Sequence, residues 1–430
     1  MTRVFFGLGS NLGDRKRNLE ESLQHLRKIL HKSEIQVSPV YESPALLPEK
    51  APLDWSRPYL NLVAEGFWTD SAEALLSEIK KIESSFGKRN KERWSPRLID
   101  IDLLLFGSEV LHTENLKIPH PEILKRAFVL DPLKDLDSNL KLPEKNLEAV
   151  GHLARSHPDH SPLWMGVFNI TDDSFSDGGT WANKNKLWEA IEKCEEYEIS
   201  IFDFGAESTR PGAAPVSWEL EWEKLAPILM ELKNRYANKI IRPLVSIDTR
   251  HYEAAKRALE LGIVDILNDV SGLSDLRMLD LLKSSRCSYV LMHSLTIPAD
   301  SAQTLPKDTS AVEELKKWFS QKLKVIEQAN IDLSRIILDP GIGFGKTSDQ
   351  SFEILRSIES FQTFSQRLLI GHSRKSFMKI FTGVEAKERD PESIGISLAL
   401  ASRGVDILRV HEPISHKRAY LAYEHAQLKN

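Results

Sequence analysis

Eight short apolar runs alternate with amphipathic segments in the second part of the chain, and this alternation limits the possible folds more than any other feature. Each amphipathic segment is long enough to bring the chain back to the start of the next strand. Eight parallel strands joined by crossover helices close into a TIM (β/α)8 barrel. The runs cover residues 163–168, 200–204, 244–247, 264–267, 288–292, 335–338, 367–370 and 406–408.

Polar side chains stand where these eight runs end. Active sites of this architecture lie at the C-terminal rim of the strands, so these residues are candidates for substrate chemistry. A random scatter of polar loop residues would rarely mark every strand end. The residues are Asn169, Asp203, Asp248, Asn268, His293, Asp339, Ser373, Arg374, Lys375, Arg409 and His411.

A glycine-rich stretch, Gly341-Ile342-Gly343-Phe344-Gly345-Lys346-Thr347, resembles a phosphate-binding loop of an ATPase. Pro340 occupies the position of the first glycine of that motif, which argues against the ATPase reading. The better interpretation is a tight barrel loop after Asp339.

The first part of the chain has a different order of elements. Strands are expected at residues 4–8, 35–40, 59–67 and 98–106, and helices at 14–30 and 72–86. The order β-α-β-β-α-β predicts a ferredoxin-like α+β domain. Gly7-Leu8-Gly9-Ser10-Asn11-Leu12-Gly13 is a poor dinucleotide motif, because its third glycine falls one place late.

Two aspartates mark the last of these strands. Side chains alternate along a strand, so Asp100 and Asp102 share one face while Ile99, Ile101 and Leu103 are buried on the other. Two neighbouring carboxylates repel each other unless a cation lies between them, and Mg²⁺ takes one or two carboxylates together with phosphate oxygens. The alternative is a solvent-exposed pair on a half-buried strand. The nearby cations Lys88, Arg89, Arg93 and Arg97 favour a triphosphate site.

The composition restricts the partners and the compartment. The 430 residues include 41% hydrophobic and 28% charged residues and carry a net charge of −5, which argues against nucleic acid or a membrane surface as partner. Cys194 and Cys287 cannot form a disulfide framework or a cysteine metal site. With no targeting segment visible, we expect a cytoplasmic protein. The length predicts more than one domain: residues 1–140, a polar linker at 141–162 and a barrel at 163–430.

The first domain resembles hydroxymethyldihydropterin pyrophosphokinase over its whole length. The matching pieces are Gly9-Ser10-Asn11, Ser43-Pro44, Tyr59-Leu60-Asn61, Arg93-Trp94-Ser95-Pro96-Arg97, Asp100-Ile101-Asp102, Pro119-His120-Pro121 and Arg126-Ala127-Phe128-Val129-Leu130.

That resemblance implies the roles of the site residues. Asp100 and Asp102 would hold two Mg²⁺ on ATP, and Arg97 would contact the phosphates. Tyr59 and Phe128 would sandwich the pterin. Asn61 and Ser43 would bind the polar edge of the pterin, and His120 and Arg126 would bind the nucleotide. The family pattern has glycine at Ser95 and a longer loop before it, so the choice between Lys88 and Arg89 as the cation that closes on the ATP phosphates stays open.

The barrel is similar to dihydropteroate synthase over its full length. The motifs that carry the similarity lie at residues 169–179, 205–212, 246–249, 268–269, 339–341, 373–376 and 409–411. Two departures are His372 before Ser373, where proline is common, and Glu412-Pro413 after His411.

The implied reaction joins p-aminobenzoate to the pterin methylene and expels diphosphate. Cations and donors must collect on the diphosphate, and the candidates are Asn169, Arg210, Arg409 and His411, with Asn169 also a Mg²⁺ ligand. The pterin would be bound by Asp203, Asp248, Asn268, Asp339 and Lys375, and the aminobenzoate by Thr209, Pro211 and Ser373.

Two other functions were weighed against this bifunctional enzyme. A pterin-binding barrel of the corrinoid methyltransferase kind would need no diphosphate site, so Arg210, Arg409 and His411 argue against it. A half that only regulates or scaffolds would not need Asp100, Asp102 or Asn169. The sequence leaves the oligomeric state open between a monomer and a homodimer formed through the barrel.

Overall fold

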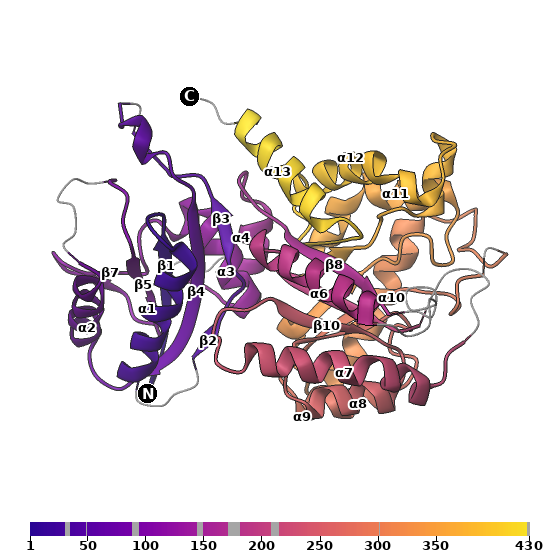
Figure 1. Cartoon of the computed structure of the whole chain (residues 1–430), viewed down its shortest axis with the longest axis horizontal. Helices are drawn as coiled ribbons and strands as arrows, with labels where there is room; N and C mark the ends of the chain where they lie inside the picture. Colours follow the sequence, from indigo (N-terminus) through magenta and orange to yellow (C-terminus); the bar gives the residue numbers. More distant parts are fainter. Residues whose placement is uncertain are drawn as a thin grey trace. The chain divides into compact units, whose positions relative to one another are not determined.

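The structure is a computed structural model that describes residues 1–30, 35–48, 50–87, 94–143, 149–170, 181–207, 215–300 and 302–427. The chain divides into two compact units (Figure 1). The first unit contains Met1–Ser161 together with Asn238–Arg242, and the second contains Pro162–Ala237 and the chain from Pro243 onward.

The first unit is built on an antiparallel sheet with the strand order β2-β4-β1-β5, and β3 also pairs with β4. Helices α1 (Arg15–Ile29) and α2 (Ala72–Ser85) cover one face of the sheet, where their leucines and isoleucines join the strand residues in one core. Asp14 and Ser71 cap these helices by accepting backbone hydrogen bonds. The strands are β1 (Thr2–Ser10), β2 (Gln36–Val37), β3 (Tyr41–Ser43), β4 (Tyr59–Trp68) and β5 (Asp100–Phe106).

The single strand expected at residues 35–40 is wrong in detail, because the structure has two short strands, β2 and β3. Between them, the hydroxyl of Ser38 accepts a hydrogen bond from the backbone N–H of Val63. Pro39 follows and has no N–H to donate, so the ladder is interrupted there.

The other face of the sheet is covered by α3 (Ala127–Leu136) and α4 (Val150–Arg155). Helix α4 lies within the stretch that we expected to be a linker. Val150 and Ala154 are fully buried, and they belong to the same core as Leu130 and Leu133 of α3. The described residues 149–161 therefore group with the first unit, whereas the sequence favoured a last helix that frays and then a tether to the barrel.

Short elements complete the first unit near the ends of its strands. Strands β6 and β7 pair with each other in a small two-stranded sheet. These elements are β6 (Leu111–His112), β7 (Lys117–Ile118), η1 (Leu53–Trp55) and η2 (Ile123–Lys125).

The second unit is a closed barrel of eight parallel strands (Figure 1). The strands are β8 (Leu163–Asn169), β9 (Ile201–Gly205), β10 (Leu244–Asp248), β11 (Ile266–Asp269), β12 (Ser288–Met292), β13 (Ile336–Asp339), β14 (Arg367–Ile370) and β15 (Ile407–Val410). The α-helices are α6 (Trp181–Glu196), α7 (Trp218–Tyr236), α8 (Tyr252–Glu260), α9 (Met278–Ser284), α10 (Ala311–Gln328), α11 (Ser348–Arg356), α12 (Asp390–Ala401) and α13 (Pro413–Gln427). The 3-10 turns are η3 (Leu333–Arg335), η4 (Ile358–Thr363), η5 (Ser376–Ile380) and η6 (Ala386–Glu388).

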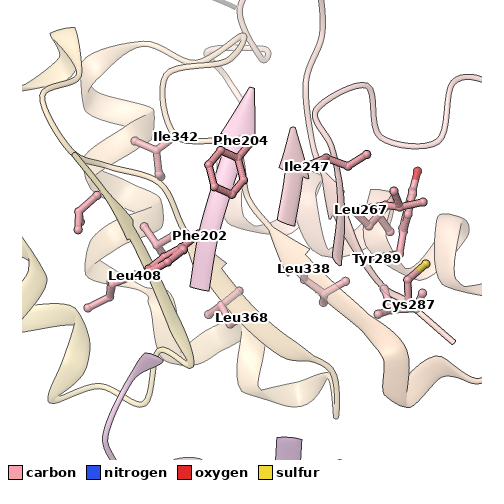
Figure 2. Packing of buried hydrophobic residues seen from close by; sticks show 14 of the residues in the cluster. Phe202, Phe204, Ile247, Leu267, Cys287, Tyr289, Leu338, Ile342, Leu368 and Leu408 are labelled. Atoms are coloured by element: carbon pink, nitrogen blue, oxygen red, sulfur yellow. The ribbon is translucent and has the colours of Figure 1, made fainter. Parts of the chain in front are cut away.

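Side chains alternate between the two sides of the barrel wall, as the pleat of a strand requires. Phe202 and Phe204 of β9 belong to the large core shared with the surrounding helices (Figure 2). Asp203 between them bonds with residues of other barrel strands. The same core holds apolar residues from several other strands, namely Ile247, Leu267, Tyr289, Leu338, Leu368 and Leu408.

The predicted fold, a ferredoxin-like α+β unit followed by a TIM barrel, is confirmed. Each barrel strand lies within two residues of its predicted position. None of the described helices is both long enough and apolar enough to cross a membrane.

Two candidate active sites

A cavity of about 320 Å³ lies in the first unit, where β1, β4 and β5 meet the start of α3. All of the predicted kinase-site residues within the described ranges line it. They are Ser43, Tyr59, Asn61, Arg97, Asp100, Asp102, His120, Arg126 and Phe128. Lys88 and Arg89 lie outside the described residues, so the open choice between them remains a prediction.

The strand register explains why these side chains meet. On the central strand β1, Gly9 pairs with Asn61 on one side and with Asp100 on the other, and Gly7 pairs with Asp102. A Cβ atom on Gly9 would lie 3.1 Å from Oδ1 of Asn61 and 3.4 Å from Cδ1 of Tyr59. The glycines of this strand therefore leave room for the site residues of its neighbours.

The two carboxylates of β5 have cationic neighbours. Nη1 of Arg97 donates to Oδ1 of Asp100 at 2.7 Å. Oδ2 of Asp102 lies 3.6 Å from Nη1 of Arg126 and 3.9 Å from Nε2 of His120. Burial raises the pKa of Asp102, and the charge of Asp100 adds to the shift. Burial lowers the pKa of His120, so its neutral form is favoured.

The residues predicted for the pterin are held from β3, β4 and α3. The amide of Asn61 donates to the hydroxyl of Ser43 at 2.9 Å. Ser43 pairs with Tyr59 in the sheet, and Phe128 lines the cavity from the first turn of α3. The guanidinium of Arg126 lies 5.8 Å from the centre of the Phe128 ring. A sandwich of the pterin between Tyr59 and Phe128 remains a prediction.

One positioning residue of this site was missed. Oδ1 of Asn11 accepts a hydrogen bond from the backbone N–H of Arg97 at 2.8 Å, and its own N–H donates to Arg97 O at 3.3 Å. Asn11 thus fixes the backbone from which Arg97 reaches Asp100. The signal was present in the Gly9-Ser10-Asn11 motif, but the sequence alone gave Asn11 no partner.

The barrel contains a second cluster at the C-terminal ends of its strands. The guanidinium of Arg409 donates from Nε to Asp203 at 2.7 Å and from Nη2 to Asp248 at 2.8 Å. Asp203 also accepts from the hydroxyl of Ser246 at 2.6 Å and from the amide of Asn268 at 3.3 Å. Four predicted site residues therefore form one hydrogen-bonded group, and Asp203 has no exposed surface.

Burial controls the ionisation of this cluster. It raises the pKa of Asp248 to about 7, although the charge of Arg409 opposes the shift. Burial also raises the pKa of Asp339, whose Oδ1 accepts from the N–H of Gly341 at 2.8 Å. The site therefore holds carboxyl groups that ionise less readily than in water.

Lys375 follows β14 and reaches the loop after β13. Its Nζ donates to Ile342 O at 2.7 Å and lies 4.7 Å from the centre of the Phe344 ring. Burial lowers the pKa of Lys375 to about 8, opposed by the charge of Asp339.

The remaining predicted synthase residues surround this group. The hydroxyl of Ser373 lies 3.1 Å from Nδ1 of His411 and accepts from its backbone N–H at 3.4 Å. Asn169 is exposed at the end of β8, where it pairs with Gly205. Three predicted residues, Thr209, Arg210 and Pro211, lie outside the described residues.

Two polar residues near the strand ends have partners outside this group. The Asp269 carboxylate accepts from the hydroxyl of Tyr289 and from the backbone N–H groups of Ser271 and Leu273. The Arg374 guanidinium binds both oxygens of Asp390 at 2.7 Å. Both residues stabilise the barrel loops.

The comparisons with known proteins agree with this division. The 7,8-dihydro-6-hydroxymethylpterin-pyrophosphokinase family matches residues 5–138, and the pterin binding enzyme family matches residues 165–411. A folate synthesis bifunctional protein of Chlamydia trachomatis is 36% identical over 97% of both chains.

The chain belongs to the bifunctional folate synthesis family. It is a transferase with both activities: the pterin is first diphosphorylated and then converted to pteroate. Two solved structures resemble the barrel. The dihydropteroate synthase of Anaplasma phagocytophilum with bound 6-hydroxymethylpterin-monophosphate is 30% identical, covers 62% of this chain and 99% of its own, and has a TM-score of 0.55. That of Xanthomonas albilineans with 4-aminobenzoic acid is 29% identical, covers 63% and 94%, and has a TM-score of 0.56.

Proposed function

We propose that the cavity of the first unit binds 6-hydroxymethyl-7,8-dihydropterin and ATP, and that its residues transfer the diphosphate. The observation that carries the assignment is that all nine described kinase-site residues line one cavity. Tyr59 and Phe128 hold the pterin ring between them, and Asn61 and Ser43 bind its polar edge. Arg97, His120 and Arg126 bind the nucleotide, together with Lys88 or Arg89.

The carboxylates of β5 fit Mg²⁺ bound with the nucleotide. Asp100 and Asp102 line the same cavity, and burial together with the charge of Asp100 raises the pKa of Asp102, so a further cation beside the two carboxylates would stabilise their ionised forms. The described residues contain no group of three or more His, Cys, Asp and Glu side chains able to hold a metal. That fits a metal held by two carboxylates and by the phosphates of its substrate. Two bound Mg²⁺ would offset the negative charge of the transferred phosphates.

The protein's own groups position the reactants for this transfer. Phosphoryl transfer depends mainly on alignment and on charge stabilisation. Arg97 is fixed by Asn11 and by Asp100, so its guanidinium is oriented before the nucleotide arrives. The substrate hydroxyl attacks the β-phosphorus of ATP and loses its proton to solvent, the bond between the β-phosphorus and the oxygen bridging to the α-phosphate breaks, and AMP leaves with the bonding electrons.

For the barrel, we propose that pterin diphosphate binds at the group formed by Asp203, Asp248, Asn268, Asp339 and Lys375. Diphosphate is bound by Arg409, His411, Asn169 and Arg210, and Asn169 would also hold one Mg²⁺. Asn169 fits that role because it stands exposed at the strand end. The aminobenzoate is placed against Thr209, Pro211 and Ser373. The bound ligands of the two solved relatives support this choice of substrates.

The condensation breaks the bond between the pterin methylene and the diphosphate oxygen, which keeps the electron pair. The amine of p-aminobenzoate forms the new C–N bond and loses a proton. Positive charge develops on the pterin as diphosphate leaves, and the carboxylates of Asp248 and Asp339 are suited to stabilise it. Arg409 and His411 act on the departing anion.

The test is a coupled assay with the pure protein. Hydroxymethyldihydropterin, ATP, Mg²⁺ and p-aminobenzoate should give dihydropteroate and AMP in equal amounts. Leaving out p-aminobenzoate should stop the reaction at pterin diphosphate with AMP still formed. Supplying pterin diphosphate should bypass ATP. If dihydropteroate forms neither in the complete assay nor from supplied pterin diphosphate and p-aminobenzoate, the assignment of the barrel is wrong.

We also propose a cytoplasmic protein that forms a homodimer through its barrel. Both cysteines are free and buried, which suits a reducing compartment. Ile380 and Phe381 of the barrel expose 58% and 55% of their surface, and such apolar side chains favour an interface. Sedimentation of the wild type and of an Ile380→Lys/Phe381→Lys variant tests the dimer.

A further inference from the structure

A buried lysine outside the predicted site lies beside the residues that hold Lys375. Lys346 ends the glycine-rich loop after β13, and only 7% of its surface is exposed. Its Nζ lies 2.8 Å from Phe344 O, 2.9 Å from Nδ1 of His293 and 3.3 Å from His293 O. An ammonium has three N–H donors, and these are three acceptors for it. Burial lowers the pKa of Lys346, and the charge of Asp339 opposes that change.

The backbone of the loop is shaped for close contact with the segment after β12. Gly341, Gly343 and Gly345 have positive φ angles of 65°, 80° and 67°. A Cβ atom on Gly341 would lie 2.0 Å from His293 O, and one on Gly345 would lie 2.6 Å from Cγ of Leu295. The glycines therefore let the loop approach the backbone of His293 and the side chain of Leu295 closely, and Lys346 joins the two segments by bonding both to its own loop and to His293.

His293 is suited to this contact. Burial lowers its pKa to about 3, so the ring is neutral and Nδ1 can accept a hydrogen bond from Lys346. The ring lies edge-on to Trp318, with 4.9 Å between the ring centres. The acceptor thus has a fixed orientation.

The loop matters because it provides the partners that the structure gives to the ammonium of Lys375. Ile342 O accepts its hydrogen bond, and the Phe344 ring lies beside it. Lys346 bonds to the carbonyl of that same Phe344. A loop released from His293 would move both partners of Lys375 together.

We propose that Lys346 is a positioning residue of the synthase reaction. It holds the loop of residues 341–346 against His293, so that Ile342 and Phe344 keep the ammonium of Lys375 in place for the pterin diphosphate. This rests on the role proposed above for Lys375. Lys346 acts through Lys375 and is assigned no contact with substrate.

A double-mutant cycle on the full chain tests the proposal. The variants are Lys346→Met, Lys375→Ala and the pair, and calorimetry measures the Kd of pterin diphosphate. Lys346→Met should weaken binding about tenfold, within the range measured for coupled neighbours. In the Lys375→Ala background it should have no further effect. A residue with only a structural role would give the same loss in both backgrounds, which would overturn the proposal.

The controls separate the possible failures. If Lys375→Ala alone leaves the Kd unchanged, the proposed role of Lys375 is wrong. If it weakens binding but Lys346→Met does not, this inference is wrong. Lys417→Met is the matched control, because Lys417 donates to Tyr197 O and Glu198 O at 2.9 and 3.1 Å, before the start of β9. It should not change the Kd. If Lys346→Met does not fold, His293→Gln replaces it in the same cycle, with the same criterion.

Discussion

The two units hold the charges of their sites in opposite ways. In the first unit, the side chains of Asp100 and Asp102 expose 28% and 35% of their surface, with the guanidinium groups of Arg97 and Arg126 at 2.7 and 3.6 Å. In the barrel, Arg409 binds Asp203 and Asp248 directly, and these carboxylates expose 0% and 11%. The first site presents charge to solvent, whereas the second neutralises much of its charge internally.

This difference follows from the supporting architecture. A strand with one face in a cavity can present two carboxylates to a ligand that arrives with its own cations. The end of a closed barrel brings side chains from several strands together, so unlike charges pair before a ligand binds. A ligand in the barrel therefore meets an arginine already paired with two buried carboxylates, whereas a ligand in the first unit meets partly exposed ion pairs.

The comparison predicts that removing one arginine has a much larger effect in the barrel. Arg409→Ala leaves Asp203 and Asp248 without their cation, and should cost about 3–5 kcal/mol of stability in that unit. Arg97→Ala removes a partly exposed pair and should cost about 1 kcal/mol or less. Hydrogen exchange of peptides from β9 and β5 measures the two units separately. Equal losses of protection would show that burial does not distinguish the two sites.

Asp102→Asn should lower the kinase activity of the first unit and leave the synthase activity of the barrel unchanged. Loss of one carboxylate should lower diphosphoryl transfer roughly 100- to 1000-fold, as for other preorganised charges in active sites. AMP formation from ATP measures this step. The synthase rate on supplied pterin diphosphate is the internal control. A variant that keeps most of its kinase rate with Mg²⁺ would remove Asp102 from the metal site.

The buried charges should also give the synthase a narrow pH range. Asp248 must be ionised to accept hydrogen bonds from the pterin, which requires a pH above its pKa of about 7. Lys375 must be protonated, which requires a pH below its pKa of about 8. Synthase kcat/KM for pterin diphosphate should therefore fall about tenfold per pH unit beyond these limits.

A single variant checks the alkaline limb. Lys375→Arg keeps its charge at every accessible pH, so the fall above pH 8 should disappear even if the maximum rate is lower. The cations among the described residues of the kinase site are arginines, with no lysine of this kind. The kinase rate of the same chain should therefore show no fall near pH 8. An unchanged alkaline limb in the variant would contradict the assignment to Lys375.

Much of both sites could be predicted because strand alternation is a local property. The spacing of Asp100 and Asp102 placed both on one face, and the strand ends marked Asp203, Asp248 and Arg409. The sequence could not predict which charges would pair, because Arg409 and Asp203 are 206 residues apart in the chain. It also could not show that helix α4, with little apolar surface of its own, packs on α3.

Two serines offer the most sensitive test of how the units differ, with the smallest expected effect. Ser43 accepts from the Asn61 amide in the first unit, and Ser373 contacts His411 in the barrel. Each hydroxyl orients one recognition side chain through hydrogen bonds, and a typical hydrogen bond contributes about 0.5–1.5 kcal/mol, or roughly two- to tenfold in affinity.

Ser43→Ala should therefore raise the KM for hydroxymethyldihydropterin by that factor and leave the KM for ATP unchanged. Ser373→Ala removes the contacts of one hydroxyl with both the ring and the backbone N–H of His411, so it should cost more than Ser43→Ala, measured as the KM for pterin diphosphate. Since each variant keeps the other unit unaltered, the activity of that unit is an internal control for protein quality. A larger loss for Ser43→Ala than for Ser373→Ala would contradict this expectation. It would mean that the open cavity depends on its fixed hydrogen bonds more than the buried cluster does.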